Sequence, residues 1–161
     1  MFISRSKEEN VSYICLSVPL DLLAPGARRS AERFAEIARV TIQQHRHRVI
    51  QTRRTPDLMV VRNAKLLVVY AVVCPAPMLD EHHLANGLSI PIVLLWPQGH
   101  PCARAIRKLP QVVEFREWET PGKALEHLKR FLGEYRDFSG EPRPRLAAAE
   151  TSDWRQESDP A

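Results

Sequence analysis

The sequence predicts a three-layer α/β sandwich, in which helices cover both faces of a central, mostly parallel sheet of about five strands. Short β-branched apolar runs alternate with longer amphipathic segments along most of the chain. Residues 66–74 (LLVVYAVVC) and 90–96 (IPIVLLW) are apolar almost throughout, which is typical of strands buried on both faces. Parallel strands need crossover connections, and the alternation supplies a helix for each connection.

Each expected strand is a short apolar run, rich in β-branched residues, that is bounded by a turn signal. Proline follows three of these runs. Pro19 follows the first, Pro75 and Pro77 are expected to end the run at residues 66–74, and Pro97 follows the run at residues 90–96. The shortest run is the pair Val49 and Ile50, which lies between basic residues. The expected strands are residues 13–18, 49–50, 66–74, 90–96 and 112–115.

Each expected helix follows a start signal or repeats its apolar residues at intervals of three and four. Pro25 opens the first helix, on which Phe34, Ala38 and Ile42 share one face. Thr55-Pro56-Asp57 signals the start of a short helix, because Asp is a common helix-capping residue. The expected helices are residues 25–42, 57–63, 79–89, 103–109 and 121–135.

The length and composition predict one domain with extensions at both ends. A chain of 161 residues can bury one sizeable core but not two. We expect the domain at residues 11–138, after a polar N-terminal extension at residues 1–10. Residues 139–161 are rich in Pro, Arg, Glu, Ser and Ala, and a disordered tail is expected there.

The charge pattern and the cysteines limit the possible partners. The formal net charge is +4, but the basic residues are scattered among acidic ones except at residues 46–54 (RHRVIQTRR). Scattered charge favours a small phosphate-bearing ligand over nucleic acid. Three cysteines without paired spacing indicate a reduced protein. No apolar run has the length of a transmembrane helix, so we expect a cytoplasmic protein without a membrane partner.

The sequence indicates no metal or cofactor. Its histidine pairs, such as His82-His83, lack the ligand spacing of known metal motifs, since adjacent residues on a helix point about 100° apart. Glycine is scarce and forms no phosphate loop of the Walker or dinucleotide type. We therefore expect no cofactor.

Two carboxylates follow the strand expected at residues 66–74. Ligand sites of α/β domains lie beyond the carboxyl ends of such strands, which makes Asp80 and Glu81 candidates for chemistry. Asp57 leads the element that feeds into the same strand. Two carboxylates beside one pocket can divide the work of nucleophile and proton carrier. The alternative is structural, because negative charge at a helix start is stabilised by roughly 0.3–1 kcal/mol.

A small basic cluster, formed by Arg104, Arg107 and Lys108, is a candidate contact for a phosphate group. The alternative interpretation is a solvated helix face.

The chain from residue 57 to residue 135 contains motifs in a familiar order. Glu81 is followed by Ala85, by Gly87 and then by Pro91-Ile92-Val93, and Asp57-Leu58 precedes them all. In this order the sequence resembles the nucleoside 2-deoxyribosyltransferase-like superfamily, and it is most similar to the 2′-deoxynucleoside 5′-phosphate N-hydrolases. Cys15-Leu16-Ser17 stands where that family has Cys-Gly-Ser.

This resemblance implies a Rossmann-like (flavodoxin-like) fold and an N-glycosidase. Glu81 would attack C1′ of a nucleoside or nucleoside 5′-monophosphate and form a glycosyl-enzyme intermediate, while Asp57 would orient the sugar or move the proton. Water as the acceptor gives a hydrolase, and a second base gives a deoxyribosyltransferase.

The resemblance also implies a small-molecule nucleoside or nucleotide as the partner. The residues expected to bind it are Ser17, Asp80, Arg104 and Arg107. Members of the family pair as homodimers, and residues 103–108 would complete the pocket of the neighbouring subunit.

Several differences from the family favour a second hypothesis. Leu16, Val18 and Pro19 stand where relatives carry a glycine-rich turn, and Ala103 stands where a phosphate-contacting Ser is expected. Asp80 beside Glu81 would raise the pKa of Glu81 by like-charge repulsion if both faced the pocket. On this hypothesis the chain is a catalytically degenerate nucleotide-sensing or protein-interaction module of the same fold.

Overall fold

The computed structural model describes residues 12–73, 76–101 and 104–135. A single five-stranded sheet has the strand order β2-β1-β3-β4-β5, and each neighbouring pair is parallel. The strands are β1 (Ile14–Ser17), β2 (Val49–Gln51), β3 (Leu66–Tyr70), β4 (Ile92–Pro97) and β5 (Val112–Trp118). This arrangement confirms the predicted α/β fold class and is the flavodoxin-like strand order.

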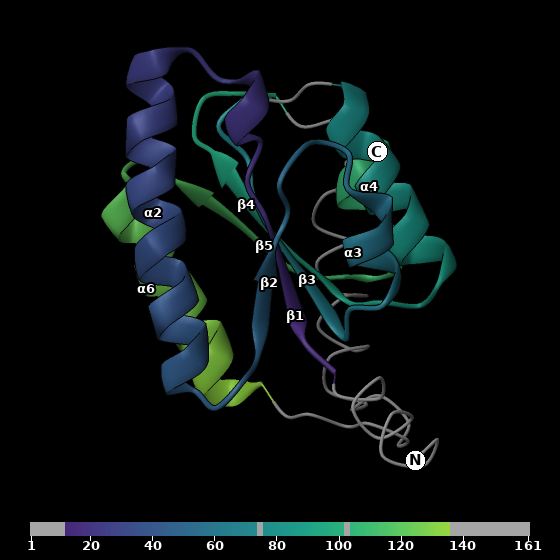
Figure 1. Cartoon of the computed structure of the whole chain (residues 1–161). Coiled ribbons are helices and arrows are strands. Elements are labelled where there is room, and N and C mark those ends of the chain that lie inside the picture. Colours follow the sequence, from purple (N-terminus) through teal and green to yellow (C-terminus); the bar gives the residue numbers. More distant parts are fainter. Residues whose placement is uncertain (1–11, 74–75, 102–103, 136–161) are drawn as a thin grey trace, which may run out of the picture.

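Helices cover both faces of the sheet, so that the molecule has three layers (Figure 1). The long helices α2 and α6 lie on one face, while α3 and α4 lie on the other. The helical elements are η1 (Leu20–Leu22), α2 (Pro25–Gln44), α3 (Leu58–Arg62), α4 (Ala76–Gly87), α5 (Arg104–Arg107) and α6 (Pro121–Glu134).

The alternation of side chains along β1 divides the core into two halves. Ile14 and Leu16 belong to the apolar cluster that packs against α2 and α6. Cys15 belongs to the cluster on the α3 and α4 side. Successive side chains of a strand point to opposite faces, so Ser17 shares the face of Cys15, a free, buried cysteine. Cys74 and Cys102 lie outside the described residues.

The boundaries around β3 differ from those predicted. The strand ends at Tyr70 rather than at residue 74, and α4 begins at Ala76 rather than at residue 79. Pro77, which was expected to end the strand, occupies the first turn of α4. Proline is tolerated there because the first N–H groups of a helix have no partner within the helix. The tail expected at residues 139–161 and the extension at residues 1–10 lie outside the described ranges.

The chain reverses direction across the sheet between β1 and β3. From β1 it crosses through α2 to β2 at one edge, and from there it returns through α3 to β3 on the other side of β1. Connections that leave neighbouring strands in opposite directions open a crevice at the carboxyl ends of those strands. Ser17, the last residue of β1, lies at this point and pairs with Val69 of β3.

Three stacked rings hold α2 against the sheet. The ring of Tyr70, at the end of β3, lies 3.7 Å from that of Phe34 and 4.9 Å from that of Trp118, centroid to centroid. Phe34 has a relative exposure of 1%. We predict that Phe34→Ala lowers the free energy of unfolding by about 3–5 kcal/mol, through lost burial and a cavity, as measured by urea denaturation.

Val40→Ala is the control for this substitution, because Val40 lies on the same helix with a relative exposure of 51%. Its effect should stay within about 0.5 kcal/mol. Equal losses in the two variants would show that the stacked rings do not hold the helix.

Candidate active site

Glu81 is a fully buried carboxylate on the sheet-facing side of α4. Its relative exposure is 0%, and Met78 and Ala85, which lie on the same helix, are buried with it. Because α4 begins at Ala76, Glu81 lies in the second turn of the helix. A side chain in the second turn does not cap the helix, so the helix dipole does not explain why a carboxylate is buried here.

Two donors from different parts of the chain hold the carboxylate of Glu81. The Ser17 hydroxyl donates a hydrogen bond of 2.5 Å to Oε1. The backbone N–H of Asp57 donates one of 2.9 Å to Oε2. The end of β1 and the start of α3 therefore meet at one side chain of α4, beside the crevice at the carboxyl ends of the strands.

The pKa of Glu81 is raised above its ordinary value of 4.5, and burial is the largest cause. The hydrogen bonds from Ser17 and from the Asp57 N–H act in the opposite direction, because they stabilise the charged form. The negative charges of Asp57 and Asp21 raise the pKa further. Burial and like charges together outweigh the two donors.

Asp57 acts on Glu81 in two ways, since its backbone N–H donates a hydrogen bond and its negative charge raises the pKa of Glu81. It occupies the N-cap position of α3, but its side chain makes no capping hydrogen bond. Its Oδ2 instead accepts from the Arg53 N–H at 3.3 Å. The structure thus brings Asp57 and Glu81 together through the Asp57 amide. The division of catalytic work between their two carboxylates stays a prediction.

Asp21 is a neighbour of the site that was not expected from the sequence. It lies in η1, directly after β1, and its Oδ2 accepts from the Thr55 N–H at 3.2 Å. This bond ties the segment after β1 to the loop that precedes Asp57. Its position four residues after Ser17 is a signal that could have found it, because segments after the carboxyl ends of strands line such crevices.

Asp80, the neighbour of Glu81 in sequence, is exposed on α4. The carboxylates that raise the pKa of Glu81 are Asp57 and Asp21, which come from other segments. A substrate-binding role for Asp80 stays a prediction.

The predicted basic cluster lies at the other edge of the sheet. Arg107 is half-buried, with its guanidinium 4.7 Å from the ring centre of Phe115. The register places Phe115 level with Ser17 but three strands away, a separation of about 14 Å. The side chain of Arg104 lies outside the described part of the structure. Within one chain, the structure does not bring Arg107 to Glu81, and its phosphate contact stays a prediction.

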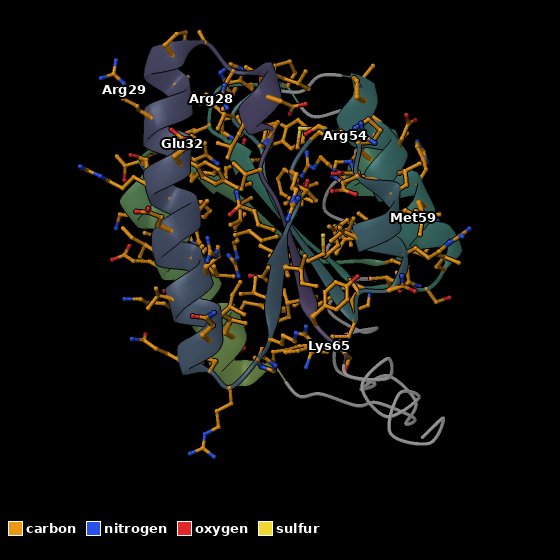
Figure 2. All side chains as sticks on the ribbon, viewed as in Figure 1. Arg28, Arg29, Glu32, Arg54, Met59 and Lys65 are labelled. Carbon is orange, nitrogen blue, oxygen red and sulfur yellow. The ribbon has the colours of Figure 1, made fainter. Side chains whose placement is uncertain are left out.

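The segment at residues 46–54 is divided by β2. His47 lies before the strand and contacts Lys65 at 3.0 Å, whereas Arg53 and Arg54 follow the strand. Figure 2 shows Lys65 near the start of β3 and Arg54 at the other end of the molecule. The segment therefore does not form one continuous basic surface.

The described residues hold no metal-binding group of three or more His, Cys, Asp or Glu side chains. His82, beside Glu81 on α4, is buried, and burial lowers its pKa to about 4, with a smaller contribution from His83. A neutral imidazole is therefore expected at this position near neutral pH.

The fold and the buried carboxylate define a Rossmann-like α/β protein with a polar site at the point where the strand order reverses. Among solved structures, the chain is similar to the CMP N-glycosidase BcmB of Clostridium botulinum. The TM-score is 0.55 at 13% identity, and the match covers 73% of this chain and 98% of that chain. At this identity the likeness shows a shared fold.

No model of a known protein family matches the sequence, and no curated protein matches it. None of the helices in the described ranges is long and apolar enough to cross a membrane.

The raised pKa of Glu81 predicts a pH-dependent stability. Between the ordinary value of 4.5 and the raised value, the folded protein keeps a proton that the unfolded chain has released. The free energy of unfolding therefore falls as the pH rises through this window. Relative to Glu81→Gln, which lacks the titrating group, the wild type should lose stability across the window and then level off. Urea denaturation at a series of pH values measures this difference.

Glu126→Gln is the matched control, because Glu126 is exposed on α6. Its stability profile should run parallel to that of the wild type. A Glu81→Gln profile that also runs parallel would contradict a raised pKa.

Proposed function

We propose that this protein is an N-glycosidase that cleaves the N-glycosidic bond of a nucleoside or nucleoside 5′-monophosphate, with Glu81 as the nucleophile. The observation that carries the proposal is the Glu81 carboxylate held by the Ser17 hydroxyl and the Asp57 amide. The site lies where α/β folds bind their ligands. The shared fold with an enzyme described as a CMP N-glycosidase supports the same class of reaction.

The two hydrogen bonds suit a nucleophile. Each carboxylate oxygen has about two lone-pair positions, so one accepted bond leaves the other position for attack. Donors on both Oε1 and Oε2 also fix the plane of the carboxylate. The nucleophile is then already oriented for attack, which lowers the entropic cost of the reaction.

In the first step a Glu81 oxygen forms a bond to C1′ while the bond from C1′ to the base nitrogen breaks. The electron pair of that bond goes to the base, which takes up a proton delivered from solvent through Asp57, so that in this proposal Asp57 is ionised both before and after the step. In the second step, an acceptor attacks C1′ and releases the Glu81 carboxylate. When water is the acceptor, it loses a proton to solvent through Asp57 and the free sugar is released. When a second base is the acceptor, a new nucleoside forms.

The complete burial of Glu81 favours a second candidate function. Both oxygens are bonded within the protein and the side chain has 0% exposure. A carboxylate used in this way can serve to join β1, α3 and α4 without reacting. The protein would then be a non-catalytic nucleotide-sensing or protein-interaction module, with Glu81 as a structural cross-link.

Release of free base separates the two functions. Wild-type protein is incubated with a panel of nucleosides and their 5′-monophosphates, and free base is measured by chromatography. We predict that Glu81→Gln lowers the rate of base release by about 10³-fold or more, because the amide cannot act as the nucleophile. Glu126→Gln should retain the wild-type rate. Absence of base release by the folded wild type across the panel would favour the module.

The hydrogen bond from Ser17 should set the pH dependence of the reaction. The attacking group is the ionised carboxylate, so kcat/KM should rise with pH through the raised pKa of Glu81. Since the Ser17 hydroxyl lowers this pKa, Ser17→Ala should move the rising limb to higher pH. Ser30→Ala, at an exposed position of α2, should leave the limb in place. An unmoved limb in an active Ser17→Ala variant would show that Glu81 is not the titrating group.

The dimeric assembly stays part of this proposal. Residues 103–108 of one subunit would reach the pocket of the other, which would bring Arg107 toward a bound phosphate across the interface. Nucleic acid is not a partner in this proposal.

A further inference from the structure

Two buried threonine hydroxyls, those of Thr52 and Thr55, take no part in the hydrogen bonds that hold Glu81. Thr52 and Thr55 have relative exposures of 4% and 9%. Among the described residues, no group forms a hydrogen bond with either Oγ1. Buried hydroxyls are nearly always hydrogen-bonded, since leaving one without a partner is costly. Two of them in one short loop indicate a place for a polar ligand.

The sheet register places Thr52 beside Ser17. The Thr52 N–H donates to the Leu16 carbonyl at 3.0 Å, which extends the ladder by one residue beyond the pairing of Leu16 with Gln51. Thr52 is therefore the lateral neighbour of Ser17, at the strand spacing of about 4.8 Å. Laterally paired residues point to the same face of a sheet, so Thr52 shares the face on which Ser17 meets Glu81.

Thr55 reaches the same region from the loop. Its N–H is held by Asp21 at 3.2 Å. Two residues later, the Asp57 N–H is held by Glu81 at 2.9 Å. Both ends of the segment from Thr55 to Asp57 are therefore anchored to carboxylates of the site.

The surrounding charge indicates the chemistry of the ligand. Asp21 and Asp57 are close enough to Glu81 to raise its pKa by their negative charge. A phosphate group placed among these carboxylates would be repelled. Neutral hydroxyl groups are not repelled, and they can both donate to a carboxylate and accept from a threonine hydroxyl. The inner part of the site thus suits the hydroxyls of a sugar.

We propose that Thr52 and Thr55 form a subsite for the hydroxyl groups of a pentose, and that the preferred sugar carries both its 2′- and 3′-hydroxyls. Two neighbouring sugar hydroxyls match two threonine hydroxyls that lack partners. The assignment of a pentose rests on the proposed function. The phosphate of a nucleotide would point outward, toward the end of the molecule where Arg28 and Arg54 lie (Figure 2).

Binding of sugar phosphates tests the subsite without any need for catalysis. The probes are D-ribose 5-phosphate and 2-deoxy-D-ribose 5-phosphate, with inorganic phosphate as the third arm, and binding to the full chain is followed by calorimetry or NMR titration. The wild type should bind the ribose compound about tenfold more tightly than the deoxy compound, because a subsite hydroxyl stays unpaired with the latter. This ratio should fall toward one in Thr52→Val and Thr55→Val, which keep the side-chain shape.

Thr41→Val provides the matched control. Thr41 is another buried threonine, but it lies on α2 and its hydroxyl already donates to the Ile37 carbonyl at 2.8 Å. This variant should keep the wild-type preference for ribose. Without ligand, Thr52→Val and Thr55→Val should raise Tm by about 2 °C, because each replaces an unpaired hydroxyl, whereas Thr41→Val should lower it. These shifts also show that the variants fold.

Four outcomes would overturn the inference. They are absence of saturable ribose 5-phosphate binding to the wild type, equal affinity for the two sugars, binding matched by inorganic phosphate, and an unchanged preference in both Thr52→Val and Thr55→Val. The proposed function fails separately. If ribose binding depends on the threonines but no base is released, the subsite is supported and the glycosidase activity is refuted. If base is released but the protein does not discriminate between the two sugars, the glycosidase activity is supported and the subsite is refuted.

Discussion

The arrangement of the site depends on the burial of one carboxylate, that of Glu81. Removing an ionised carboxyl group from water costs several kcal/mol unless hydrogen bonds replace its hydration. Glu81 receives such bonds from Ser17 and from the Asp57 N–H, and each donor belongs to a different segment. The end of β1, the start of α3 and the second turn of α4 must therefore keep their relative positions for the charge to be tolerated. Loss of either donor would leave the carboxylate partly unpaired. Glu81 therefore fixes the relative positions of the three segments.

The sheet topology explains why these segments can meet. With the order β2-β1-β3-β4-β5, the strand that carries Ser17 lies directly beside the strand that leads into α4. The loop after β2 enters from the outer side of β1 and brings Thr52, Thr55 and Asp57 over the carboxyl end of that strand. The bond between the Thr55 N–H and Asp21 then fixes the loop to η1. The polar groups come from four segments, but they gather at the end of one strand.

The sequence predicted the fold class, and it named three residues that the structure brings together, Ser17, Asp57 and Glu81. The reasons are local. Apolar runs reveal buried strands, and their alternation with helices implies parallel order, which places Ser17, Asp57 and Glu81 at one edge. It placed the start of α4 three residues late, because Pro77 was read as a break rather than as a first-turn residue. It missed Asp21, Thr52 and Thr55, since their roles depend on the register between β1 and β2. A slip of one residue would turn Thr52 to the other face, and the three residues Val49–Gln51 carry too weak a pattern to fix that register.

The same crowding of negative charge that disfavours the ionised site would favour the proposed reaction. Asp21 and Asp57 raise the pKa of Glu81, so the free protein holds its carboxylates together at a cost. In glycosidic bond cleavage, positive charge develops on the sugar as the base departs. Negative groups fixed around C1′ would repel one another before the reaction. During the reaction they would attract the positively charged sugar. The burial of Glu81 strengthens its own part in both effects, because charges are screened weakly in the low-dielectric interior. Since Glu81 is fully buried, a substrate that reaches its carboxylate must displace the groups that cover it, and the developing positive charge of the sugar then meets the negative groups directly.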